Sequence, residues 1–182
     1  MKPQLPTTIL AIVSGALLSG CALFQSAMPA TTLSDSDVLA MLDTINLIEI
    51  NAAGLAKQKA FSEDTRMYAD RMLNEHTMKL QETRQLAQRL HIQPQPPALA
   101  SSATQIHQAT MEELRHLSDR DFDRAYLRYQ IEMHERASNF VKETAGSVDN
   151  SQLQQYLRQA HPDLEDHLRA ARALQRQLVA KD

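Results

Sequence analysis

The segment SEDTRMYADRMLNEHTMKLQETRQLAQRLHIQPQPP, residues 62–97, decides the fold class of this 182-residue chain. Ser62 and the two acidic residues after it have the composition of a helix N-cap and first turn. Apolar residues then recur every three or four positions up to Leu90, which is the period of a helix with one buried face. The prolines at the end of the segment stop the helix, because proline cannot continue the hydrogen-bond ladder. We therefore predict one long helix that ends before Ile92.

Similar patterns on both sides of this segment predict further helices. An earlier helix begins at the capping residues Ser34 and Ser36 and ends near Lys59-Ala60, where a tight turn leads into the second helix. Beyond the prolines, the pattern predicts a shorter helix over about Ala103–Leu117, a long one over about Asp119–Ala145, and a last one that starts between Asp149 and Ser151.

The predicted fold class is all-α. Two short-linked hairpins of long helices, joined by a long crossover that carries the short extra helix between helices 2 and 3, form a ferritin-like four-helix bundle. Composition agrees, because the chain has only four glycines and no tryptophan and is rich in good helix formers. Two irregularities are expected: residues 98–102 form a loop, and Pro162 breaks or kinks the last helix.

Composition also excludes several classes of function. The formal net charge is -3, and acidic and basic residues are interspersed rather than gathered in a basic stripe. We therefore expect no nucleic-acid binding and no electrostatic attraction to anionic lipids. With a single cysteine, the chain cannot form an internal disulfide. We expect no enzyme, because neither a nucleophile with a paired base nor a glycine-rich phosphate loop stands out.

The N-terminal region carries a separate signal. An apolar run that begins near Ile9 ends in Leu18-Ser19-Gly20-Cys21, which is the pattern of a lipoprotein signal peptide cut before an acylated cysteine. The run is far too short to span a bilayer. A lipid anchor at Cys21, followed by Ala22 rather than by an aspartate, indicates an outer-membrane lipoprotein that faces the periplasm.

The predicted organisation therefore has three parts. Residues 1–20 form the signal peptide, residues 21–35 contain the lipidated Cys21 and a flexible tether, and residues 36–180 form the four-helix domain.

Four ionisable residues fall on or beside stripes that are otherwise apolar, one in each long helix: Glu49, His76, His134 and His167. Burying such groups is costly unless they are paired or bind a metal. Counting from the helix ends at about 1.5 Å per residue places Glu49, His76 and His134 at one level of the bundle. His167 matches this level less well, and His161 is nearer to it by count.

Two interpretations of these four residues stay open. The first is a single metal ion, because imidazoles and a carboxylate suit zinc, iron or copper. The second is a structural hydrogen-bond network in which Glu49 pairs with the histidines. A di-iron centre is not predicted, because it needs Glu-x-x-His pairs. The residues three positions before the histidines are Leu73, Ile131 and Leu164.

Other polar residues have simpler explanations. His91, His107 and His116 are expected on or near exposed faces, where water solvates them. Asp123 is expected to cap its helix or to pair locally.

Three motifs resemble one protein family. They are Ala69-x-x-Met72-x-x-x-His76, then Phe122-Asp123-x-x-Tyr126 with His134 downstream, then Pro162-x-Leu164-x-x-His167-Leu168. In this order and spacing they resemble the bacterial domain of unknown function 4142 family, over most of residues 36–177. The resemblance implies a ferritin-like fold and an outer-membrane or secreted location, but no reaction.

Together these observations predict an envelope lipoprotein whose helical domain faces the periplasm and acts as a non-catalytic binding or stress-accessory module. One alternative is a metal-binding protein that uses Glu49 and the core histidines. The other is a structural partner of another envelope protein, which the sequence does not identify.

Overall fold

The computed structural model describes residues 33–180. The predicted signal peptide at 1–20, the lipidated Cys21 and most of the tether lie outside the described residues. They stay predictions from the sequence.

Five helices make up the described part of the chain, and no strand occurs in that part. They are α1 Asp35–Lys59, α2 Glu63–Leu90, α3 Ala98–His116, α4 Asp119–Thr144 and α5 Ser151–Ala180. The all-α class is therefore confirmed. Hydroxyl caps start the first two helices as predicted: the side chain of Ser34 accepts from the N–H of Asp37, and that of Ser62 accepts from the N–H of Thr65.

One expectation about the helices was wrong, and another was wrong in part. Residues 98–102 are not a loop, because α3 already begins at Ala98, directly after Pro97. The small alanines and serines of this stretch are compatible with a helix, and alanine favours one. The break expected at Pro162 is also absent, since α5 continues through it, and the alternative expectation of a kink stays a prediction. Proline removes one ladder hydrogen bond, but buried Leu157 and Leu164 pack the helix onto the core on both sides of it.

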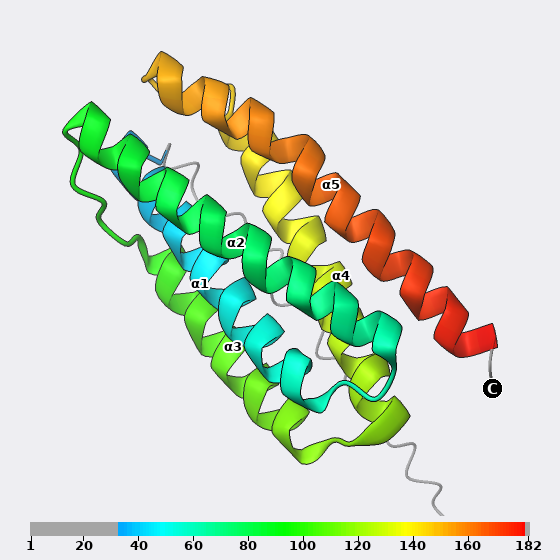
Figure 1. Ribbon diagram of the computed structural model, residues 1–182. Coiled ribbons are helices and arrows are strands. Elements are labelled where there is room, and N and C mark those ends of the chain that lie inside the picture. Colours follow the sequence, from blue (N-terminus) through cyan, green and yellow to red (C-terminus); the bar gives the residue numbers. More distant parts are fainter. Residues whose placement is uncertain (1–32, 181–182) are drawn as a thin grey trace, which may run out of the picture. The chain divides into compact units, whose positions relative to one another are not determined.

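The helices form two antiparallel hairpins, α1–α2 and α4–α5, connected by α3 (Figure 1). Because α3 carries the chain back along the bundle, α2 and α4 run in the same direction. At one end, the carboxylate of Asp35 accepts hydrogen bonds from the backbone N–H groups of Asp149 and Asn150. These contacts join the start of α1 to the turn before α5. The connectivity is that of ferritin-like bundles.

Asp123 connects the hairpins at the opposite end. Its buried carboxylate accepts hydrogen bonds from the backbone N–H groups of Phe61 and Ser62 in the α1–α2 turn. The expectation of a local cap was therefore wrong, because the partners of Asp123 lie on the other hairpin.

The apolar core is divided into two clusters along the helices. On α1 one cluster ends at Ile45 and the other begins at Ile48, and on α5 the change falls between Leu164 and Ala171. Buried polar side chains lie at or near this division: Asn46, Glu49, His76, Gln130, His134 and His167. The bundle thus places a polar layer between two apolar halves.

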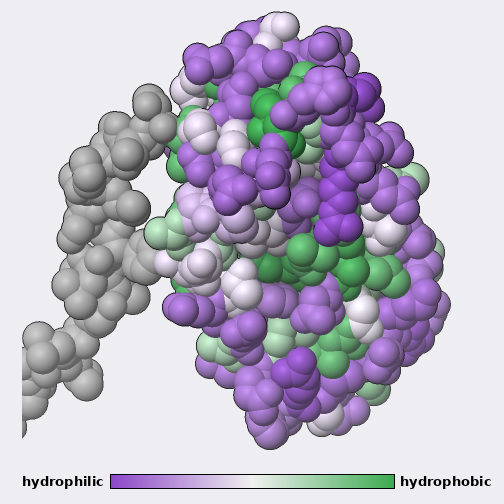
Figure 2. Space-filling model, turned by 90° about the vertical axis from the view of Figure 1, so that its left-hand side faces the viewer, coloured by the Kyte–Doolittle hydropathy of each residue, from purple (hydrophilic) through white to green (hydrophobic). Residues whose placement is uncertain are grey.

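Of the described helices, α1 alone is long and apolar enough to cross a membrane. However, 61% of its apolar window is buried inside the bundle, as expected for a core helix. On the face shown in Figure 2, hydrophilic side chains predominate and apolar residues form smaller areas between them.

Candidate metal centre

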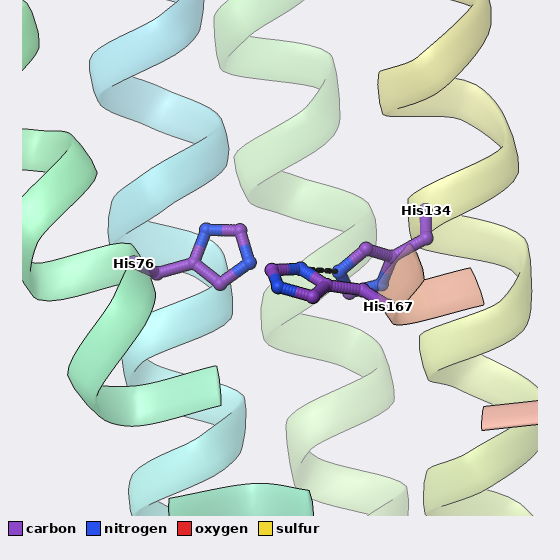
Figure 3. Close-up of side chains that lie close together, drawn as sticks. All are labelled: His76, His134 and His167. Atoms are coloured by element: carbon purple, nitrogen blue, oxygen red, sulfur yellow. Dashed lines mark hydrogen bonds between the residues drawn. The ribbon is translucent and has the colours of Figure 1, made fainter. Parts of the chain in front are cut away.

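Three histidines from three helices meet inside the polar layer. His76 comes from α2, His134 from α4 and His167 from α5, and their rings point toward one another (Figure 3). One nitrogen from each ring lies within 4.8 Å of the others. All three residues are at most 2% exposed. We call this group the histidine trio.

The outer nitrogen of His134 has a partner that fixes its tautomer. His134 Nδ1 lies 2.9 Å from the backbone oxygen of Gln130. A carbonyl oxygen only accepts hydrogen bonds, so Nδ1 must carry the proton and donate it. In the neutral ring, Nε2 then holds a lone pair, and this nitrogen faces Nδ1 of His167 at 3.2 Å.

The outer nitrogen of His167 donates to a carboxylate. His167 Nε2 lies 2.5 Å from Oε2 of Glu75, and Glu75 also accepts from Arg71 Nε at 2.7 Å. Burial alone would raise the pKa of Glu75, but the hydrogen bonds from Arg71 and His167 lower it, so the group is an ionised acceptor. His167 therefore presents the lone pair of Nδ1 to the trio.

His76 is oriented by an amide whose direction is also fixed. Asn46 Nδ2 donates to the backbone oxygen of Leu42 at 2.9 Å, which turns Asn46 Oδ1 toward Nδ1 of His76, 2.9 Å away. His76 Nδ1 therefore donates to this oxygen. Its Nε2 is buried and has no hydrogen-bond partner. An unsatisfied buried nitrogen is uncommon and calls for an explanation.

Burial keeps the trio able to bind a cation. Desolvation, followed by repulsion from its neighbouring histidines, lowers the pKa of His76 well below its ordinary value. Desolvation, with repulsion from His134, lowers the pKa of His167 to about 4. Near neutral pH these rings are uncharged. In this neutral state His76 and His167 each direct the lone pair of an inner nitrogen into the trio, an arrangement that a bound cation would stabilise.

The geometry and donor type suit a transition metal. Nitrogens about 2.0–2.1 Å from a tetrahedral ion lie roughly 3.4 Å apart, close to the 3.2 Å between His134 and His167, and all three nitrogens lie within 4.8 Å of one another. In metal sites the second ring nitrogen of a ligating histidine normally donates to a carboxylate, a carbonyl or a water. The trio has such acceptors in place for every member: Glu75, the Gln130 carbonyl and Asn46.

Glu49, the fourth candidate, lies beside the trio rather than in it. Its Oε1 is 3.8 Å from Nδ1 of His134, the outer nitrogen, and its Oε2 accepts from Gln130 Nε2 at 2.8 Å. Burial raises the pKa of Glu49, whereas the nearby His134 and the hydrogen bond from Gln130 oppose that change. Tyr68 extends the network, since its hydroxyl donates to Gln130 Oε1 at 3.2 Å. Glu49 therefore accepts a hydrogen bond from Gln130 and lies beside the outer nitrogen of His134, away from the inner nitrogens of the trio.

The remaining histidines behave differently from one another. His161 is partly exposed and lies 4.0 Å from Glu165, outside the trio. The expectation that His107 is solvated was wrong, because it is only 6% exposed and is hydrogen-bonded to Tyr129 and Asn51.

Sequence reasoning missed the acceptors that orient the trio. Asn46 is a polar residue next to Ile45 on the apolar stripe of α1, and this position was a usable signal. No comparable signal in the sequence pointed to Glu75, because this residue lies next to His76 on a partly exposed face of the helix. Its partner His167 is 92 residues away in the chain.

The fold and the trio define a class: a helical-bundle protein with a candidate metal centre of three buried histidines. Residues 22–174 match the family model described as Domain of unknown function (DUF4142), so the chain belongs to that family. The resemblance seen in the sequence motifs is thereby confirmed. A search of curated proteins found no significant match.

Among solved structures, the chain is similar in fold to CopM. The Cu(II)-bound form matches with a TM-score of 0.63 at 12% identity, over 80% of this chain and 98% of that chain. An Ag-bound form obtained by co-crystallization matches with a TM-score of 0.57 at 18% identity, over 81% and 94%. The apo form matches with 0.56 at 16% identity, over 81% and 95%. At these identities the likeness establishes the fold alone.

Proposed function

We propose that this chain is a metal-binding protein of the cell envelope that holds one copper ion between His76, His134 and His167. The observation that carries the proposal is the convergence of three ring nitrogens whose partner nitrogens are already committed to oxygen acceptors. A purely structural network explains the outer hydrogen bonds. It does not explain why the inner nitrogen of His76 is left without a partner.

Copper is the preferred ion for two reasons. The donor set is three imidazoles, which suit copper, zinc, iron or nickel rather than magnesium or calcium, and copper(II) has the highest affinity in the divalent series. CopM, which has a similar fold, was solved with Cu(II) and with Ag bound. The preference for copper rests on the three histidines of this chain, and the similar fold of CopM supports it. Zinc is the competing ion.

The proposed role is binding and not turnover. The ligands are buried and each is oriented by its own acceptor, so the ion would be held by a preformed set of donors. A titratable acid or base aimed at a substrate is not part of this arrangement.

The first experiment measures the metal content of protein purified without a histidine tag. Elemental analysis after copper loading and desalting should give about one copper per chain, and competition with zinc should favour copper. The matched controls are the triple variant His76→Gln/His134→Gln/His167→Gln and the single variant His107→Gln. The proposal is wrong if the wild-type chain retains no more copper than the triple variant.

The proposed location is the outer membrane, with the helical domain in the periplasm and lipid attached to Cys21. The signal pattern that ends at Cys21 supports this location. Mass spectrometry of the membrane fraction should find a mature N-terminus that starts at an acylated Cys21. The Cys21→Ser variant should leave the membrane fraction. A non-acylated N-terminus in the wild type would contradict the proposal.

A further inference from the structure

A cavity of about 30 Å³ lies beside the histidine trio. His76, His167 and the orienting Asn46 line it. Most of its wall is apolar and comes from α1, α4 and α5: Leu42, Ile45, Ala137, Val141, Ala160 and Leu164. A water needs about 10–15 Å³ of such space, so this cavity has room for a molecule of two or three atoms.

The partly exposed residues of the cavity mark its route to solvent. Lys79 on α2 and Asp163 on α5 form an ion pair of 2.9 Å, and their side chains are 30% and 47% exposed. Both line the same cavity as His76 and His167, which are almost fully buried. The cavity therefore connects two of the proposed ligands with the surface between α2 and α5.

The protein supplies only three donors to the proposed ion. Within residues 33–180, no carboxylate or thiol shares the convergence of the trio. Glu49 is engaged by Gln130 and lies against the outer nitrogen of His134. Sites with three protein ligands keep a fourth position for water or substrate, whereas structural sites close it with a fourth side chain.

We propose that the fourth coordination position opens into this cavity and takes a small exogenous molecule of two or three atoms, with water as the resting occupant. This inference rests on the proposed copper site and adds a ligand to it. The size of the ligand follows from the volume of the cavity.

Carbon monoxide is the probe for this position, since it is a neutral diatomic that binds copper(I). The full chain is loaded with copper(I) under anaerobic conditions, and its copper content is measured on the same sample. Infrared spectroscopy should then show one carbon monoxide stretch, which saturates at one carbon monoxide per bound copper.

Three variants test the cavity itself. Ala160→Val places two additional carbons in the wall and should weaken carbon monoxide binding at least about tenfold, the scale expected for overfilling a packed site. Val141→Ala enlarges the cavity and should leave the affinity equal or higher. Ala170→Val makes the same change as the first variant on the same helix, but Ala170 does not line the cavity. It should behave as the wild type.

The outcomes separate this inference from the proposed function. If copper binds and no carbon monoxide adduct forms, the fourth position is closed and this inference is wrong while the copper site stands. Equal carbon monoxide affinity in Ala160→Val and Ala170→Val places the ligand outside this cavity and also overturns the inference. If the chain binds no copper, the proposed function fails, and the inference fails with it.

Discussion

Two groups of buried histidines in one bundle show how differently the same side chain can be used. His107 and the histidine trio are both almost inaccessible to water, and burial lowers the pKa of His107 as it lowers those of His76 and His167. The hydrogen-bond partners differ. His107 Nδ1 lies 2.7 Å from the Tyr129 hydroxyl and Nε2 lies 2.9 Å from Asn51 Oδ1.

A neutral imidazole has one donor and one acceptor, and His107 uses both. Each member of the trio uses its outer nitrogen as a donor and directs its inner nitrogen toward the other two. Burial is therefore common to both groups, and a lowered pKa is common to His107, His76 and His167. A candidate metal ligand is distinguished by a second ring nitrogen that points toward the other ligands instead of accepting a hydrogen bond from a residue such as Tyr129.

The largest expected effect is on metal affinity. Replacing His134 by glutamine removes one of three donors, so the affinity for copper should fall by more than about 100-fold, beyond the range seen for mutations of the orienting residues. His107→Gln should bind copper as the wild type does. The measurement is a competition titration against a chelator of known affinity. Equal losses in the two variants would mean that the comparison between the groups is wrong.

The next effect concerns the residue that orients His167. Glu75→Gln keeps an acceptor but removes its charge, so copper affinity should fall about tenfold. Glu82→Gln is the matched control, since Glu82 is on the same helix and pairs with Lys79 instead of a histidine. Unchanged affinity in Glu75→Gln would show that this carboxylate does not orient the ligand.

In the metal-free protein the order should reverse: replacing His107 should lower the free energy of unfolding more than replacing a member of the trio. His107→Leu leaves the buried Tyr129 hydroxyl without its partner and should cost about 1–3 kcal/mol, whereas the exposed Asn51 can bond to water instead. His76→Leu deprives only Asn46 of a partner, and it also removes the unsatisfied Nε2. His76→Leu should therefore lower the free energy of unfolding by less than His107→Leu does. Urea unfolding of the metal-free variants measures both values, and a larger loss for His76→Leu would contradict this ranking.

The last effect is on the pH dependence of metal-free stability. The folded pKa values of His76 and His167 lie below the unfolded value of about 6.5. The unfolded chain therefore binds more protons in acid, and stability is lost as the pH falls from about 6.5 toward about 4. Each such histidine contributes a slope of up to about 1.4 kcal/mol per pH unit. The His76→Gln variant should show a shallower slope in chemical unfolding at pH 4.5–6.5, and an unchanged slope would count against a lowered pKa.

The helices and the shared level of His76 and His134 could be predicted because they depend on local patterns, whereas the same count favoured His161 over His167, which is the residue that joins them. Apolar spacing and the caps at Ser34 and Ser62 define the starts of α1 and α2, and residue counting brought His76 and His134 to one level. The local signals at Pro162 and at residues 98–102 predicted breaks that do not occur. At Pro162 tertiary packing outweighs the signal, and at 98–102 the alanine-rich composition favours a helix.

The orientation of the rings could not be predicted. It depends on contacts between residues far apart in the chain, such as Glu75 with His167 and Asn46 with His76. The same limit explains His107, whose partners lie on α1 and α4. The histidine trio therefore emerges only when the helices are packed.

X-ray absorption spectroscopy of the copper-loaded chain tests the central claim most directly, because it reports the donors around the ion. We predict three imidazole nitrogens at about 2.0 Å from the copper, a signal that His107→Gln leaves intact and His134→Gln reduces. A first shell dominated by oxygen, or one that is the same in the wild type and in His134→Gln, would contradict it.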